Sequence, residues 1–195
     1  MTDSNSGNTP KKIIPRKTSM AIPFRPSPSE QGTKFTVEID MFDHLSRALE
    51  GESAARKWLI DNMREIRKNH PDVKYSVLLR EISLAFVIDS KYLEGYKLDK
   101  DAESQDIKLK CKFHKPNGDI AHAPFNIPKT LAYAINKLNE LEKTGRTLED
   151  EVIDLQQEYR DKIHADGGKS EYPLAYFVRR DMLMDVIDED LFDLD

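Results

Sequence analysis

The segment TKFTVEID, residues 33–40, constrains the fold of this 195-residue chain more than any other. Phe35, Val37 and Ile39 alternate with polar residues, which is the pattern of a strand with one buried face. The next strand-like run begins about 70 residues later. Because an unpaired strand leaves its backbone donors and acceptors unsatisfied, this strand needs a partner that the neighbouring sequence does not show.

Two amphipathic segments follow directly. The stretch MFDHLSRALEG predicts a helix that ends at Gly51, and Ser53 is suited to cap the start of a second helix. Apolar residues at helical spacing mark the side of each helix that we expect to be buried: Met41, Phe42, Leu45, Ala48 and Leu49 in the first, and Ala55, Trp58, Leu59, Met63 and Ile66 in the second. The order is therefore strand, helix, short turn, helix.

This order, over residues 34–68, resembles the ribbon-helix-helix family of DNA-binding regulators, to which the methionine and Arc repressors belong. In that family one strand from each of two subunits pairs antiparallel, and the resulting ribbon enters the major groove of DNA. The resemblance implies that residues 33–40 pair with their copy in a second subunit. It also implies a sequence-specific transcriptional regulator, serving plasmid conjugation or another mobile element.

The same resemblance assigns DNA contacts to two places. Lys34, Thr36 and Glu38 would reach base edges from the exposed face of the ribbon, because Lys can donate to guanine, Thr can touch thymine and Glu can accept from cytosine. The start of the second helix would hold a phosphate with its backbone amides and nearby basic side chains. The residues at that start are Ser53, Ala54, Ala55, Arg56 and Lys57. An ordinary helix hairpin capped by Ser53 is the alternative interpretation.

Charge is divided between the two ends of the chain. Residues 1–32 hold five of the ten prolines and predict a flexible basic arm that follows the DNA backbone or enters a minor groove. The basic residues that we assign to this contact are Lys11, Lys12, Arg16 and Lys17. Residues 181–195 carry seven acids and no base, so a chain of net charge -5 is left with +2 elsewhere. Two solvated ends without a binding role are the alternative.

The acidic end also contains apolar residues at helical spacing, which are Met182, Leu183, Val186, Ile187, Leu191 and Phe192. We expect a tail over residues 181–195 that contacts a transcription or replication protein, or that folds over a basic surface when DNA is absent.

The middle of the chain predicts helices and one β-hairpin. Pro71 is expected in the first turn of a third helix. Residues 107–113 alternate as a strand, KPNGD at 115–119 signals a turn, and residues 120–127 read as the returning strand, with Pro124 indicating an edge position. Two helices over residues 128–145 and 147–163 follow, the second opened by a capping box of Thr147 and Asp150, and a last amphipathic segment covers 172–187.

These elements predict a mostly helical α+β fold. We divide it into an arm (1–32), the ribbon-helix-helix module (33–69), a region of helices and hairpin for oligomerisation or partner contact (70–180) and the acidic tail (181–195). Lys108, Lys110 and Lys112 form a stripe with a spacing of about 7 Å, close to that of successive phosphates. Protection of an edge strand against aggregation explains this stripe as well, and we favour that explanation.

The sequence favours a binding protein over an enzyme. It has no phosphate-binding glycine loop, no HExxH motif and no recognisable nucleophile turn. With one cysteine, Cys111, and five scattered histidines we expect no disulfide, metal or cofactor. The longest apolar run, residues 84–88, is far too short for a membrane span, and no leader is evident, so we expect a cytoplasmic protein without a membrane partner.

The interpretation is therefore a homodimeric or higher-order regulator of double-stranded DNA. The alternative is a single-stranded-DNA-binding or replication accessory protein, in which the lysine stripe holds the strand and the acidic tail recruits partners. A protein-binding adaptor is a third interpretation.

Overall fold

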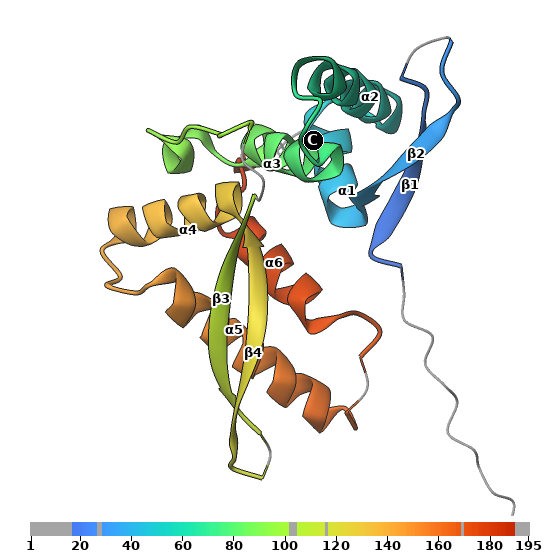
Figure 1. Cartoon of the computed structure of the whole chain (residues 1–195). Helices are drawn as coiled ribbons and strands as arrows, with labels where there is room; N and C mark the ends of the chain where they lie inside the picture. The colour runs from blue at the N-terminus through green and yellow to red at the C-terminus, as the bar shows by residue number, and fades with distance from the viewer. Residues whose placement is uncertain (1–16, 27–28, 102–104, 116, 169, 190–195) are drawn as a thin grey trace, which may run out of the picture.

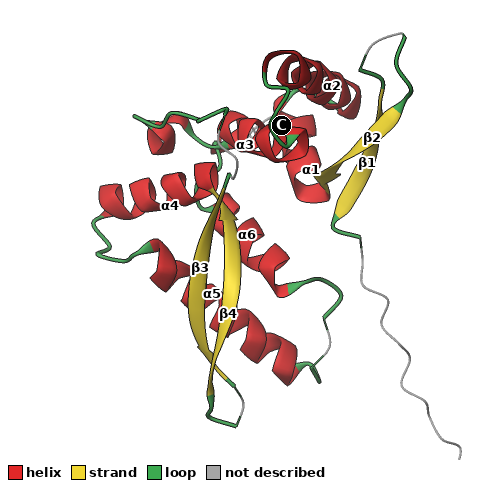
Figure 2. Cartoon of the chain, in the orientation of Figure 1, coloured by secondary structure: helices red, strands yellow, loops and turns green. Residues whose placement is uncertain are grey.

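The computed structural model describes residues 17–26, 29–101, 105–115, 117–168 and 170–189. These parts of the chain form six α-helices, a short 3-10 helix and two separate two-stranded antiparallel sheets, which confirms the α+β, mostly helical class (Figure 2). The elements in chain order are β1 (Ser19–Phe24), β2 (Thr33–Glu38), α1 (Ile39–Ala48), α2 (Glu52–Asn69), α3 (Tyr75–Val87), η1 (Ser90–Leu93), β3 (Asp106–His114), β4 (Ile120–Pro128), α4 (Lys129–Glu142), α5 (Leu148–Ala165) and α6 (Leu174–Met184).

Figure 1 shows how these elements are arranged. The β1–β2 hairpin, α1 and α2 lie at one end, and the β3–β4 ribbon with α4, α5 and α6 lies at the other, with α3 between the two groups. One core of buried apolar side chains runs through both groups, from Ile22 and Leu45 to Leu131 and Val178. No helix in the described ranges has both the length and the apolar content that a bilayer span requires.

The partner of β2 is β1 of the same chain. The two strands pair antiparallel, with Ile22 opposite Phe35 and Pro23 opposite Lys34. The expectation that residues 33–40 pair with their copy in a second subunit is therefore wrong. Residues 19–24 also correct the expected extent of the flexible arm, because they form a strand within it. Met20, Ile22 and Phe24 alternate with Ser19, Ala21 and Pro23, so the strand signal was present but lay within a proline-rich stretch.

The apolar face of this hairpin packs onto the first helices. Ile22, Phe24, Phe35 and Val37 are buried, and the rings of Phe24 and Phe35 meet edge to face with centroids 5.8 Å apart. The predicted buried sides of α1 and α2 are confirmed for Met41, Phe42, Leu45, Ala55, Leu59, Met63 and Ile66. Trp58 is half-buried and packs on Phe86 with ring centroids 5.0 Å apart.

Two helix starts differ from the predictions. The N-cap of α2 is Gly51 rather than Ser53, and its φ of 143° is a conformation that favours glycine. The third helix begins at Tyr75, so Pro71 lies in the turn before it and not in its first turn. The capping box of α5 is confirmed: the Thr147 side chain accepts from the Asp150 amide, and the Asp150 carboxylate accepts from the Thr147 amide at 2.9 Å.

The segment after α6 is part of the core. Met182, Leu183, Val186 and Ile187 are buried, and Ile187 forms a β-bridge with Ile88. The Asp89 amide donates to the Val186 carbonyl, and the Asp188 amide donates to the Val87 carbonyl, each at 3.0 Å. The apolar residues Met182, Leu183, Val186 and Ile187, which were expected to serve a partner contact or to cover a basic surface, are therefore part of the core of this chain. Leu191 and Phe192 lie outside the described residues.

A buried carboxylate joins the two groups of elements. Glu81, on α3, is fully buried and accepts a hydrogen bond from the Thr130 amide at 2.8 Å, in the first turn of α4. Its other oxygen accepts from Arg80, whose guanidinium also donates to Asp106 at the start of β3, at 2.6 Å. Glu81 therefore satisfies an amide that the helix itself leaves unpaired, and it ties α3 to both α4 and β3.

Replacing Glu81 with Ala should lower the free energy of unfolding by about 3 kcal/mol, because the buried Thr130 amide and the Arg80 guanidinium each lose an acceptor. Urea denaturation followed by circular dichroism measures this. Glu65→Ala, at an exposed position on α2, is the matched control and should change the free energy by less than about 0.5 kcal/mol. Equal effects of the two variants would contradict the assigned role of Glu81.

The Glu81 carboxylate should also make the free energy of unfolding depend on pH. Burial raises the pKa of Glu81 above its ordinary value of 4.5. A carboxyl with a raised folded-state pKa stabilises the fold below the unfolded-state value, and this contribution is lost as the pH rises through the folded-state pKa. The free energy of unfolding of the wild type, relative to that of Glu81→Gln, should therefore fall as the pH rises above about 4.5. A constant difference across denaturation curves at several pH values would oppose this.

Candidate functional site

The residues expected to read DNA bases do not lie on a free ribbon face. Lys34 and Thr36 are exposed, as the alternation predicts, but Thr36 and Glu38 line a cleft against α3 and α6. Glu38 accepts a hydrogen bond from Arg179 of α6 at 3.2 Å. The face that was expected to enter a DNA groove therefore faces other parts of the same chain.

The residues expected to hold a phosphate have mixed surroundings. Ser53, Ala54 and Lys57 are exposed at the start of α2, whereas Ala55 is fully buried. Arg56 pairs with Glu52 at 3.6 Å and lies over the Phe42 ring. A carboxylate at the first position of the helix reduces the attraction of its amino end for a second anion.

Of the expected arm residues, Lys17 is exposed in the segment before β1. The others, Lys11, Lys12 and Arg16, lie outside the described residues.

The β3–β4 ribbon presents an exposed basic face. Lys108, Lys110, Lys112 and His114 all point outward from β3, and their cross-strand partners on β4 are exposed as well. These partners are Asn126, Pro124, His122 and Ile120. None of the three lysines forms an ion pair with another residue in the described part of the chain. These eight exposed positions therefore carry three unneutralised positive charges and no carboxylate, and we call them the basic face below. Asp106, the next residue on the same side of β3, is only partly exposed and is paired with Arg80.

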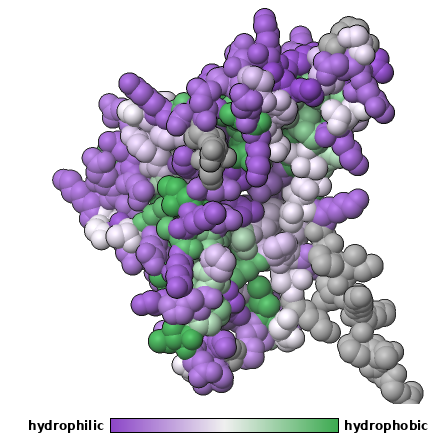
Figure 3. Space-filling view, in the orientation of Figure 1, coloured by the Kyte–Doolittle hydropathy of each residue, from purple (hydrophilic) through white to green (hydrophobic). Residues whose placement is uncertain are grey.

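The opposite face of the ribbon is held by the helices. Cys111, Phe125 and Ile127 are buried, and burial raises the pKa of the Cys111 thiol. The Arg160 guanidinium of α5 lies 3.5 Å from the centre of the Phe113 ring, and Gln157 accepts from the His114 amide at 2.9 Å. In Figure 1 the ribbon crosses α5 and extends beyond it. Figure 3, in the same orientation, shows mostly hydrophilic residues with smaller apolar areas among them.

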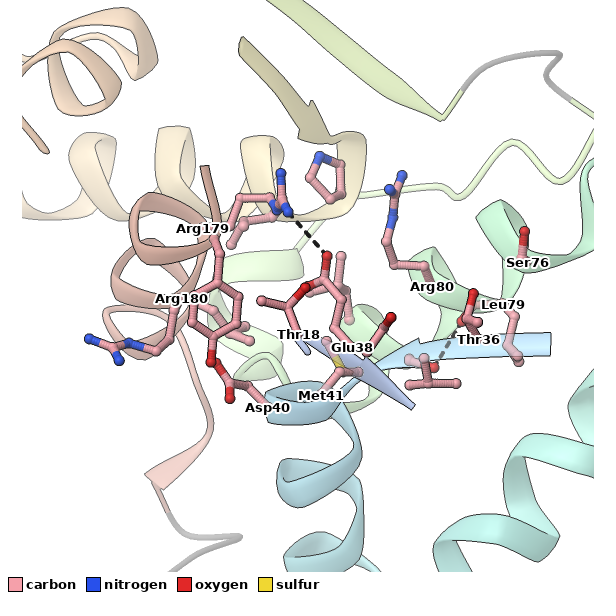
Figure 4. A pocket seen from close by; sticks show the side chains of 18 of the residues that line it. Thr18, Thr36, Glu38, Asp40, Met41, Ser76, Leu79, Arg80, Arg179 and Arg180 are labelled. Atoms are coloured by element: carbon pink, nitrogen blue, oxygen red, sulfur yellow. Dashed lines mark hydrogen bonds and ion pairs between the residues drawn. The ribbon is translucent and has the colours of Figure 1, made fainter. Parts of the chain in front are cut away.

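A cleft of about 340 Å³ lies where β2, α1, α3, α4 and α6 meet. Its apolar walls include Met41, Leu84, Leu131 and Leu183, one residue from each of four helices. Its polar lining includes the hydroxyl groups of Thr36 and Ser76 and the charged groups of Glu38, Asp40, Arg80, Arg179 and Arg180 (Figure 4).

The charged groups of the cleft differ in how fully they are engaged. Arg80 contacts both Glu81 and Asp106, and Arg180 contacts Asp181 through two nitrogens. Figure 4 shows the Arg180 guanidinium directed away from Glu38. Burial and a hydrogen bond to Asp40 raise the pKa of Tyr176. The Arg179–Glu38 pair remains partly open to solvent, with side chains that are 26% and 40% exposed.

No family model, curated protein or solved structure matches the chain. Within the described ranges, no three His, Cys, Asp or Glu side chains are grouped so that they could hold a metal ion. The two candidate sites are therefore the basic face of the ribbon and the cleft. The lysines of the basic face are evident in the sequence, although the pattern alone favours a protective role for them. The cleft is not evident in the sequence, because its residues are spread from position 18 to 183.

Arg160→Ala should loosen the end of the ribbon near its turn. The loss of the guanidinium contact with Phe113 should lower the free energy of unfolding by about 1 kcal/mol. Hydrogen exchange at the amides around His114 should become faster, since α5 then holds that end with one contact fewer, although Gln157 still accepts from the His114 amide. Lys162→Ala, two residues away on α5, is the control and should leave those amides unchanged. Equal exchange rates in the wild type and the Arg160 variant would contradict this support.

Proposed function

We propose that this protein is a DNA-binding regulator that contacts double-stranded DNA through the basic face of the β3–β4 ribbon. The observation that carries the proposal is the presence of three exposed lysines with no ion-pair partner among the described residues, while Asp106 on the same side of β3 is paired with Arg80. The proposal keeps the class that the sequence suggested, but it moves the DNA contact from β2 to β3 and β4 and does not require two subunits to share a ribbon.

Protection of an edge strand does not account for this composition. An uncovered face of a sheet needs polar side chains, and lysines mixed with acids would meet that need at lower electrostatic cost. Lys108, Lys110 and Lys112 instead stand about 7 Å apart with like charge, which is unfavourable unless an anion lies against them. A row of phosphates is such an anion, and each phosphate contact releases counterions from the DNA.

The shape of the ribbon suits a DNA groove. Each strand has nine residues, so the ribbon is roughly 30 Å long. A two-stranded ribbon of this kind fits the major groove of B-form DNA. Asn126 and His122 stand beside Lys108 and Lys112 and can form hydrogen bonds with base edges or phosphates.

Double-stranded DNA fits this face better than a single strand. Binding of single strands relies on aromatic side chains on which bases stack. The eight outward positions of the ribbon hold no Phe, Tyr or Trp, and Phe113 lies on the opposite face beneath Arg160. The face therefore offers charge and hydrogen bonds without a stacking platform.

Because the chain is acidic overall, DNA can bind only where the surface is locally positive. The chain has a net charge of -5, so association with DNA depends on a local positive surface and not on long-range attraction. Such a contact should be strongest at low salt and should weaken steeply as salt rises.

Replacing Lys108, Lys110 and Lys112 together with Gln should weaken binding to a random DNA duplex at least about tenfold at 0.1 M salt, and should reduce the slope of log affinity against log salt by roughly 2 to 3. Fluorescence anisotropy at several salt concentrations measures both quantities. The matched control replaces Lys68, Lys97 and Lys100, which are exposed on other surfaces, and removes the same total charge.

Equal loss of binding in the two triple variants would show that only net charge matters and would overturn the assignment to the ribbon. A wild type that prefers single strands over the duplex would favour the replication accessory role instead. The double variant Lys34→Ala, Thr36→Ala tests the β2 face. It should retain the preference of the wild type among duplex sequences, because that face lies against the cleft.

A further inference from the structure

We infer that the cleft between α1, α3 and α6 binds a small zwitterion with an apolar side group, of the class of apolar α-amino acids. This inference is independent of DNA binding, because no residue of the basic face lines the cleft. It rests on the size of the cleft, its apolar walls and the partly exposed Arg179–Glu38 ion pair, both residues of which line the cleft.

The size of the cleft limits the ligand. Pockets for small molecules begin at about 300 Å³, and this cleft has about 340 Å³. A water molecule takes about 30 Å³ of liquid volume, so the cleft holds roughly ten water-sized groups. That is the size of one apolar amino acid rather than of a nucleotide or a large cofactor.

The walls of the cleft favour a branched or aromatic side group. Met41, Leu84, Leu131 and Leu183 approach from four different helices, and all four are nearly fully buried. Water in such a space has few hydrogen-bond partners, so an apolar group that replaces it is favoured.

The Arg179–Glu38 ion pair selects a zwitterion over a simple acid or amine. A guanidinium has five N–H donors, and only one bond from Arg179, to Glu38 at 3.2 Å, is found with a described residue. A simple acid that took Arg179 would leave the Glu38 carboxylate without its partner. A simple amine that took Glu38 would leave Arg179 without its partner.

A zwitterion avoids both costs. Its carboxylate can form two parallel hydrogen bonds with Arg179, while its ammonium lies against Glu38 and Asp40. When the Arg179–Glu38 ion pair opens, Arg179 pairs with the carboxylate of the ligand and Glu38 pairs with its ammonium. Neither side chain is left unpaired, and the net charge of the cleft does not change. Figure 4 shows the Glu38 side chain bonded to Arg179, with Asp40 at the start of α1.

The test compares ligands that share one hydrocarbon group. Isothermal titration calorimetry of the full chain should show saturable binding of at least one of L-leucine, L-methionine and L-phenylalanine below roughly 10 mM. The matching acid and amine of leucine, 4-methylpentanoate and 3-methylbutylamine, should each bind at least about tenfold more weakly than leucine.

Two variants locate the site. Arg179→Gln and Glu38→Gln should each weaken the amino acid at least about tenfold, whereas Arg64→Gln, which removes an exposed ion pair with Asp61 on α2, should not. Circular dichroism establishes that each variant is folded. Absence of saturation by all three amino acids, equal binding of the acid or the amine, or unchanged binding in folded Arg179→Gln would each overturn the inference. None of these results tests the proposal that the β3–β4 ribbon binds DNA, because no residue of the basic face lines the cleft.

Discussion

The antiparallel pairing of β1 with β2 determines how the remaining elements are arranged. The backbone donors and acceptors of β2 need hydrogen-bond partners, and β1 of the same chain provides them. The completed hairpin then has one apolar face, which α1, α2 and α3 cover, and one polar face, which closes the cleft with α6. Pairing within the chain thus forms the cleft and removes the need for a second subunit to satisfy β2.

The two candidate sites lie on different elements. Glu38, expected to read bases, is engaged with Arg179 across the cleft. The exposed lysines belong instead to a ribbon more than 60 residues further along the chain, whose inner face is fixed by Phe113, Arg160 and Gln157. A basic and uncovered ribbon suits a polyanion, whereas a partly closed cleft lined by both guanidiniums and carboxylates suits a small molecule that carries both charges.

Local patterns predicted the fold better than long-range ones. The buried sides of α1 and α2, the capping box at Thr147 and the β3–β4 hairpin all followed from spacings of a few residues, and each was confirmed. The two main errors concern segments whose structure depends on distant partners. β1 contains a proline but is stabilised by its pairing with β2. Residues 181–189 are held by Val87, the last residue of α3, and by Ile88, which follows it. The acidic composition of this segment indicated a solvated tail, but the free energy gained by burying its four apolar residues holds it in the core.

Arg80 is the residue that connects the cleft with the ribbon. It lines the cleft, and the same guanidinium nitrogen donates to Glu81 and to Asp106, the first residue of β3. Glu81 in turn holds the first turn of α4, which follows directly on β4. The start of β3 and the end of β4 therefore both lie next to the charged network of Arg80, Glu81 and Asp106. A shift of Arg80 would act on the base of the ribbon through its contact with Asp106, whereas the far end is held separately by α5. The base and the end of the basic face thus depend on different helices, and only the base lies within reach of the cleft.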